Sequence, residues 1–169
     1  MGAGTARIAL GTDEAAVATG IAILDHLLGE LARSGRLGLS LELAPDAPEA
    51  EVEAAGTALG EACRPLLRAD GARGRGVGIV PADEALAMVV LEASARALVV
   101  SNADLTASRA GGLRRDLVAA FLGSFADAAG LTIHVRLLEG ESSEHVLLAI
   151  FKALGEALAE ALAPVGARS

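Results

Sequence analysis

Three histidines, His26, His134 and His145, could bind a metal ion or transfer a proton near neutral pH. A single histidine on an apolar element is more often a hydrogen-bonded structural residue than a ligand. Here, however, each histidine lies where the end of a predicted element could direct it: His26 on a helix, His134 on a strand, and His145 at the start of the next helix. The sequence therefore predicts that the three imidazoles face a common cleft.

An internal repeat supplies the elements that position these residues. The pentapeptide Ala58-Leu-Gly-Glu-Ala62 recurs as Ala153-Leu-Gly-Glu-Ala157, and the same order of patterns precedes both copies. Apolar residues at helical spacing over 20–34 precede an alternating strand over 37–43, and residues 116–129 and 131–137 repeat this order. A second amphipathic helix follows each strand, opened by residues 45–48 in one copy and capped by Ser142 or Ser143 in the other.

Further strands are predicted over 6–10, 14–18, 86–92 and 97–101. The predicted fold class is α+β: one domain over 1–169, built from two repeats of about 5–70 and 78–163. Each half is a small sheet with two helices on one face, and a pseudo-twofold axis relates the halves. The glycine-rich residues 70–78 lack the Gly-Lys-Ser/Thr ending of a phosphate-binding loop and precede no helix, so they predict a flexible connection.

Composition excludes several classes of function. The net charge of −8 disfavours nucleic acid and anionic membranes as partners. No uncharged apolar stretch reaches the roughly 18 residues of a membrane span, and the first residues do not form a secretory signal, so a cytoplasmic protein is expected. Cys63, the only cysteine, lies on an apolar helical face and is expected to pack in the core.

Four motifs, in order, resemble the imidazoleglycerol-phosphate dehydratases, the manganese enzymes of histidine biosynthesis. Residues 19–28 resemble the family's Thr-Gly-x-x-Phe-Leu-Asp-His-Met-Leu, and Pro81-Ala-Asp-Glu-Ala-Leu86 resembles its Pro-x-Asp-Glu-x-Leu. Residues 131–136 resemble its histidine-bearing strand, and residues 149–154 resemble the helix after its second ligand motif. The resemblance implies the fold of ribosomal protein S5 domain 2 and, if the site functions, Mn²⁺ as cofactor.

The resemblance also implies which residues bind metal, and much of this set has changed. The family's two helix motifs each hold adjacent histidines and a glutamate one turn later, a spacing that puts imidazole and carboxylate on one helix face. The metal-ligand candidates that remain are His26, Glu53, His134 and His145. The other motif positions hold Glu49, Ala50, Glu144 and Leu148.

Glu49 and Glu144 are possible substitutes as ligands, because Mn²⁺ accepts carboxylate oxygens and Glu49 and Glu53 have the spacing of a shared helix face. The alternative, which we favour, is that the acidic residues over 49–53 stabilise the first turn of a helix through its dipole. Leu148 cannot replace a carboxylate. Arg96 and Lys152 match basic positions implied to bind the substrate phosphate, and each is equally consistent with a solvated charge.

Three functions follow from this depleted set. The leading expectation is a dehydratase homologue that has lost the Mn-dependent reaction or keeps little of it, with no cofactor and no assigned catalytic residue. The second is an active dehydratase, a carbon–oxygen lyase acting on a phosphorylated small molecule through a rebuilt, carboxylate-rich site. The third is a non-catalytic structural or regulatory subunit.

Assembly is the last expectation from the resemblance. Family members form trimers that join into a cage through metal sites shared between subunits. Loss of ligands should weaken the cage more than the trimer, so a homo-oligomer is expected, as a trimer or a trimer-based cage, with the trimer or another small oligomer favoured.

Overall fold

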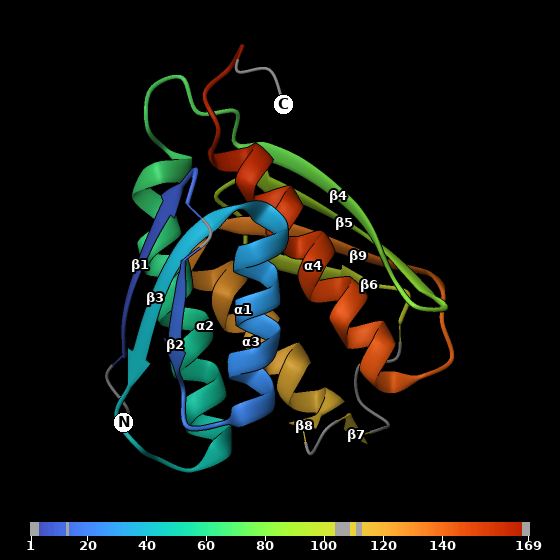
Figure 1. Cartoon of the computed structure of the whole chain (residues 1–169). Coiled ribbons are helices and arrows are strands. Elements are labelled where there is room, and N and C mark those ends of the chain that lie inside the picture. Colours follow the sequence, from blue (N-terminus) through green and yellow to red (C-terminus); the bar gives the residue numbers. More distant parts are fainter. Residues whose placement is uncertain (1–3, 13, 104–108, 111–112, 167–169) are drawn as a thin grey trace.

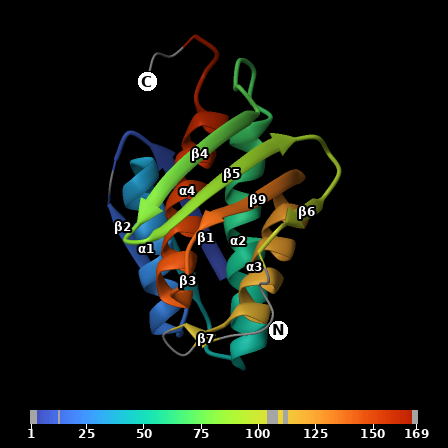
Figure 2. The ribbon, with the colours of Figure 1, turned by 90° about the vertical axis from the view of Figure 1, so that its right-hand side faces the viewer.

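Two main β-sheets enclose a layer of α-helices (Figure 1). The computed structural model describes residues 4–12, 14–103, 109–110 and 113–166. Seen from the side of the second sheet, the helices lie behind its strands and the first sheet lies behind the helices (Figure 2). The predicted α+β class, with helices on one face of each sheet, is confirmed.

Each half repeats a helix, a strand and a second helix. The elements of the first half are β1 (Gly4–Leu10), β2 (Ala15–Ala18), α1 (Ala22–Gly35), β3 (Leu37–Leu43) and α2 (Pro48–Leu67). Those of the second half are β4 (Arg75–Ala82), β5 (Ala85–Ala93), β6 (Leu98–Ser101), β7 (Arg109–Ala110), β8 (Leu113–Arg114), α3 (Arg115–Ala129), β9 (Leu131–Glu139) and α4 (Ser143–Leu162). The bounds of the predicted elements agree with those of the structure to within a few residues. No sequence pattern predicted the short strands β7 and β8.

The two sheets share a core arrangement that follows the repeat. In the first sheet, with order β1-β3-β2, β3 pairs antiparallel with β1 and parallel with β2. In the second, with order β4-β5-β9-β6, β9 pairs antiparallel with β5 and parallel with β6. The alternating apolar residues of β3 and β9 are buried against the helices, as period-two patterning requires.

Helices from opposite halves pack in two pairs, α1 with α4 and α2 with α3. The repeated pentapeptide places a glycine at each contact. A Cβ on Gly155 would lie 2.0 Å from the Leu31 carbonyl oxygen of α1, and one on Gly60 would lie 2.8 Å from the Phe125 carbonyl oxygen of α3. The repeat therefore marks two equivalent positions at which backbones approach too closely for any side chain.

The second sheet has a strand, β4, that the first sheet lacks in the described residues. The prediction of a flexible connection over 70–78 is wrong in its last part, because residues 75–78 begin β4. The sequence did not predict this strand because it contains Gly76 and Gly78, and glycine is uncommon in strands. Both are required here, because their Cβ atoms would lie 1.9 Å and 2.0 Å from carbonyl oxygens of Ala157 and Ala153 in α4.

The core is aliphatic, with three buried phenylalanines at its centre. Cys63 is fully buried in it, as expected, and burial raises the pKa of its thiol. Among the described residues, no helix combines the length and the apolar character that crossing a membrane requires.

Substitution of Gly155 or Gly60 by alanine should destabilise the fold by about 1–3 kcal/mol, because the added methyl group forces a helix pair apart. Gly29 in α1 is the matched control, because a Cβ there would meet nothing within 4 Å. Gly29→Ala should be neutral or stabilising, by up to about 1 kcal/mol. Urea unfolding of the three variants checks this, and equal effects at all three glycines would refute the close-packing account.

Candidate functional site

The first turn of α1 is fixed by a hydrogen-bonded pair that precedes His26. Thr19, 1% exposed, donates its backbone N–H to Asp25 Oδ1 over 2.8 Å and its hydroxyl to the same oxygen over 2.5 Å. The helix begins without a side-chain cap at Ile21, and the contact of Asp25 instead ties its first turn to the preceding loop. It fixes the turn on which His26 stands.

The tip of the β4–β5 hairpin holds the first turn of α4. Ser142 occupies the predicted capping position, but its side chain makes no capping hydrogen bond. Instead, Glu84 Oε1 accepts the backbone N–H groups of Ser142, over 2.8 Å, and Glu141, over 3.3 Å. The other oxygen, Oε2, lies 2.5 Å from His145 Nδ1. We call this set of contacts the Glu84 clamp.

His145 is also close to the neighbouring carboxylate. Its Nε2 lies 3.3 Å from Asp83 Oδ2. Asp83 has φ +50°, which is unusual for a residue other than glycine and turns the hairpin sharply at this point. The imidazole of His145 therefore lies between two carboxylates of one hairpin.

These elements enclose a half-open cavity of about 310 Å³ between α1, α4 and the hairpin tip. Its polar residues are two histidines and two carboxylates, and the rest are aliphatic. The lining residues are Ile23, His26, Leu27, Asp83, Glu144, His145, Leu147 and Leu148. Two of the three histidines predicted to share a cleft thus line one cavity, together with Glu144.

The charges around His145 shift the pKa values of the clamp. The hydrogen bond from Ser142 N–H, followed by that from His145, lowers the pKa of Glu84 to about 2. The hydrogen bond to Glu84, with further attraction from Glu84, Asp83 and Glu144, raises the pKa of His145 above its usual 6.5. Both shifts favour a protonated imidazole beside an ionised carboxylate.

The remaining ligand candidates lie elsewhere in the chain. Glu49 and Glu53 are exposed in the first turns of α2, which packs mainly on α3. His134 is half-buried on β9, between Ile133 and Val135, which are buried against the helices. Its side chain therefore projects from the opposite, outer face of the second sheet.

The two basic candidates are also away from the cavity lining. Arg96 is exposed after the end of β5 that is remote from the hairpin tip. The nine residues of β5 span about 26 Å, at about 3.3 Å per residue, so Arg96 cannot reach the cavity of its own chain. Lys152 pairs with Glu30 of α1, with Nζ 3.8 Å from Oε2.

The donors present within one chain do not fit a metal ion. In the described part of the chain, no group of three His, Cys, Asp or Glu side chains lies close enough to hold one. Mn²⁺ requires more ligands than one or two side chains supply.

Sequence reasoning assigned no role to Asp83 and Glu84, although they belong to the Pro81–Leu86 motif. The motif itself could have pointed to these two carboxylates. The sequence did not predict β4, however, and only the hairpin that β4 forms with β5 brings Asp83 and Glu84 to the start of α4.

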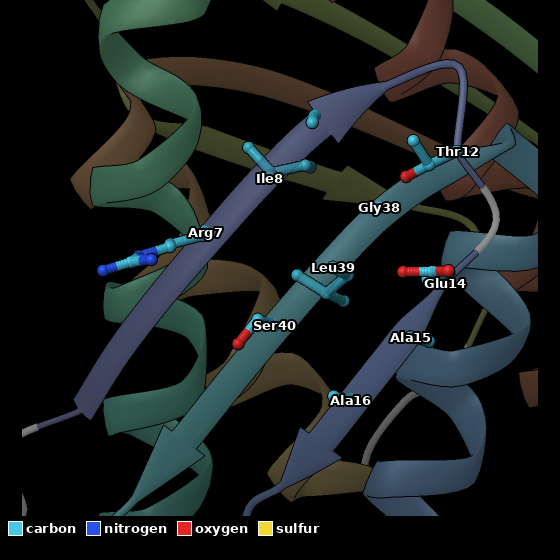
Figure 3. A pocket seen from close by; sticks show the side chains of 10 residues that line it. Arg7, Ile8, Thr12, Glu14, Ala15, Ala16, Gly38, Leu39 and Ser40 are labelled. Carbon is cyan, nitrogen blue, oxygen red and sulfur yellow. The ribbon is translucent and has the colours of Figure 1, made fainter.

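A second hollow lies on the outer face of the first sheet (Figure 3). Small side chains leave it broad and open, and none of the predicted site residues borders it. It is lined by Arg7, Ile8, Ala9, Thr12, Glu14, Ala15, Ala16, Gly38, Leu39 and Ser40. The cavity beside His145 is therefore the candidate functional site.

Comparison with known proteins gives one consistent result. The family model described as imidazoleglycerol-phosphate dehydratase matches residues 19–158. A protein of that name from Clostridium botulinum (strain Kyoto) is 38% identical over 150 residues, covering 86% of this chain and 76% of that protein. One from Bacillus cereus (strain AH187) is 36% identical, with 86% and 77% covered.

Solved structures agree with the sequence matches. The crystal structure of imidazoleglycerol-phosphate dehydratase from Staphylococcus aureus N315 has a TM-score of 0.86 at 27% identity, covering 98% of this chain and 99% of that one. The structure from Pyrococcus furiosus in complex with (S)-C348 has a TM-score of 0.81 at 28% identity, covering 93% and 88%.

The Glu84 clamp predicts how stability depends on pH. The lowered pKa of Glu84 adds stability above 4.5 that is lost as the pH falls towards 2, and the raised pKa of His145 adds stability below 6.5 that is lost as the pH rises through the folded-state value. Besides Glu84, the titratable groups that face His145 are Asp83, Glu144 and His26.

Glu84→Gln should therefore lower the urea midpoint most between pH 4.5 and 6.5. The difference in midpoint between the variant and wild type should become smaller below and above this range. Glu53→Gln, an exposed change on α2, is the control and should give no such window. Parallel midpoint curves for wild type and Glu84→Gln would contradict the clamp.

Proposed function

The chain belongs to the imidazoleglycerol-phosphate dehydratase family, a family of histidine biosynthesis, and on this premise we propose that it has lost the Mn-dependent dehydration or keeps little of it. The observation that carries the proposal is the charge of the cavity beside His145. The family's name specifies a phosphorylated substrate, and this cavity opposes one.

None of the described residues that line the cavity is lysine or arginine, whereas Asp83 and Glu144 are acidic. Two like unit charges 4 Å apart near a protein surface repel by about 4 kcal/mol. A phosphate placed here would meet both carboxylates, and the imidazolium of His145 is already paired with Glu84. Lys152, a basic residue of the fourth motif, is paired with Glu30.

The change at Leu148 supports the same proposal. The resemblance implies a carboxylate one turn after His145, and the structure has Leu148 lining the cavity at that place. An aliphatic side chain supplies no lone pair, so the imidazole has no partner on its own helix face for holding an ion.

Purified protein should turn over imidazoleglycerol phosphate far below the rate of about 1 per second that is ordinary for enzymes. After saturation with Mn²⁺ and exhaustive dialysis, elemental mass spectrometry should find close to no manganese per subunit. The Clostridium botulinum relative, assayed in parallel, is the positive control. Turnover near the rate of that relative, with manganese retained, would overturn the proposal.

One observation favours the alternative of an active lyase. His26, His145, Asp83 and Glu144 line a single cavity, and imidazole with carboxylate oxygen is a donor set that suits Mn²⁺. Under this alternative, neighbouring subunits would complete the site with Glu53, His134 or Arg96. Alanine at His134 or His145 should then abolish turnover.

We also propose that the chain forms a homo-oligomer, a trimer or another small oligomer rather than a cage. Support comes from the outer face of the second sheet, where Val77, Ile79 and Leu98 are 43%, 54% and 40% exposed. His134 lies on the same face. Apolar side chains grouped on one sheet face are typical of an interface, and an interface would equally serve a structural or regulatory subunit.

Ile79→Glu should shift the particle towards monomer in light scattering coupled to size-exclusion chromatography. Leu10→Glu, at a similarly exposed leucine of β1, is the control and should leave the mass unchanged. A cage-sized particle without added metal, or an unchanged mass for Ile79→Glu, would contradict this assembly.

A further inference from the structure

The Glu84 clamp places an acceptor against one particular nitrogen of His145. Glu84 Oε2 lies 2.5 Å from Nδ1, whereas Asp83 Oδ2 lies 3.3 Å from Nε2. An ionised carboxylate can only accept a hydrogen bond. Nδ1 must therefore carry a proton and donate a hydrogen bond to Glu84.

We propose that Glu84 is a positioning residue for His145, which holds the neutral imidazole in the tautomer protonated at Nδ1 and leaves the Nε2 lone pair available to the cavity. The two contacts of the ring differ in length. In the neutral ring, the proton lies on the nitrogen with the shorter and stronger hydrogen bond, which is Nδ1 facing Glu84.

The rest of the clamp makes this orientation rigid. Glu84 is itself fixed by the backbone N–H groups of Glu141 and Ser142, which immediately precede α4. The start of α4 and the ring of its third residue are thus held by one carboxylate. Nε2 lies on the side of Asp83, which lines the cavity with His145.

The chemical consequence is a defined role for each ring nitrogen. A histidine that donates from one nitrogen to a carboxylate presents the other as a base or as a donor of a lone pair, and its ring cannot turn freely. In its neutral form, His145 therefore offers the cavity a single, oriented basic nitrogen. A ligand of this cavity should be a hydrogen-bond donor towards Nε2.

The inference rests on the proposal that this cavity is the functional site, but its test does not require turnover. The tautomer is read from the two imidazole ¹⁵N chemical shifts of His145 in the full-length protein, at about pH 9, well above the ordinary histidine pKa of about 6.5. His145→Gln identifies the signals, since the chain has three histidines. A failed activity assay thus leaves this result intact.

Wild type should show a protonated Nδ1 and an unprotonated Nε2. Glu84→Gln should invert the two signals, because the amide oxygen can still accept from Ser142 N–H while the amide nitrogen donates to Nδ1. Asp83→Asn is the matched control at the adjacent residue. It should leave Nδ1 protonated, because it alters only the group facing Nε2.

Two results would overturn the proposal. One is a wild-type ring protonated on Nε2 at this pH. The other is a Glu84→Gln ring with the wild-type tautomer while circular dichroism shows an intact fold. If Glu84→Gln fails to fold, Glu84→Asp serves instead, and its shorter side chain should yield a mixture of the two tautomers rather than the wild-type pattern.

Discussion

Backbone contact between helices at Gly60 and Gly155 is the constraint from which the remaining geometry follows. Each glycine lets a helix of one half approach the backbone of a helix from the other half. The α1–α4 contact in turn brings the first turns of these two helices together, and the candidate cavity lies between them. The pentapeptide that identifies the duplication is thus a packing requirement, because a larger side chain at its centre would separate the halves.

The duplication is incomplete, and the asymmetry creates the site. In the second half, Gly76 and Gly78 allow β4 to lie on the backbone of α4. The hairpin that β4 forms with β5 then carries Asp83 and Glu84 to the start of α4. In the described residues, the first sheet has no strand beyond β1, and the matching helix α2 leaves Leu66 37% exposed. Among the described residues, a hairpin that holds a clamp like that of Glu84 is therefore present in only one half.

Periodicity in the sequence was sufficient for the fold class and the helices, because burial of aliphatic residues determines both. The recurring pentapeptide revealed the repeat. Periodicity failed where the local preference of a residue opposed its tertiary role, as at Gly76 in β4. The shared location of His26 and His145 was predictable from their motifs. His134 was expected in the same cleft, but the alternation of β9 buries Ile133 and Val135 and directs the residue between them to the outer face of the sheet. The contact of Glu84 with His145 depends on residues 61 positions apart, and no local pattern contains it.

The carboxylates that orient His145 also limit which ligands the cavity can bind. An ion pair between Glu84 and a protonated imidazole is stable only while the ring keeps its proton, whereas a metal binds the deprotonated ring. A cation that binds the ring of His145 must therefore displace a proton that Glu84, Asp83 and Glu144 together stabilise. With Leu148 in place of a carboxylate, the cation gains no new ligand from that helix face in exchange. The free-energy balance favours a protonated His145 over a metal-bound one. This is the physical basis for expecting a family member that has kept this histidine but lost the dehydration reaction.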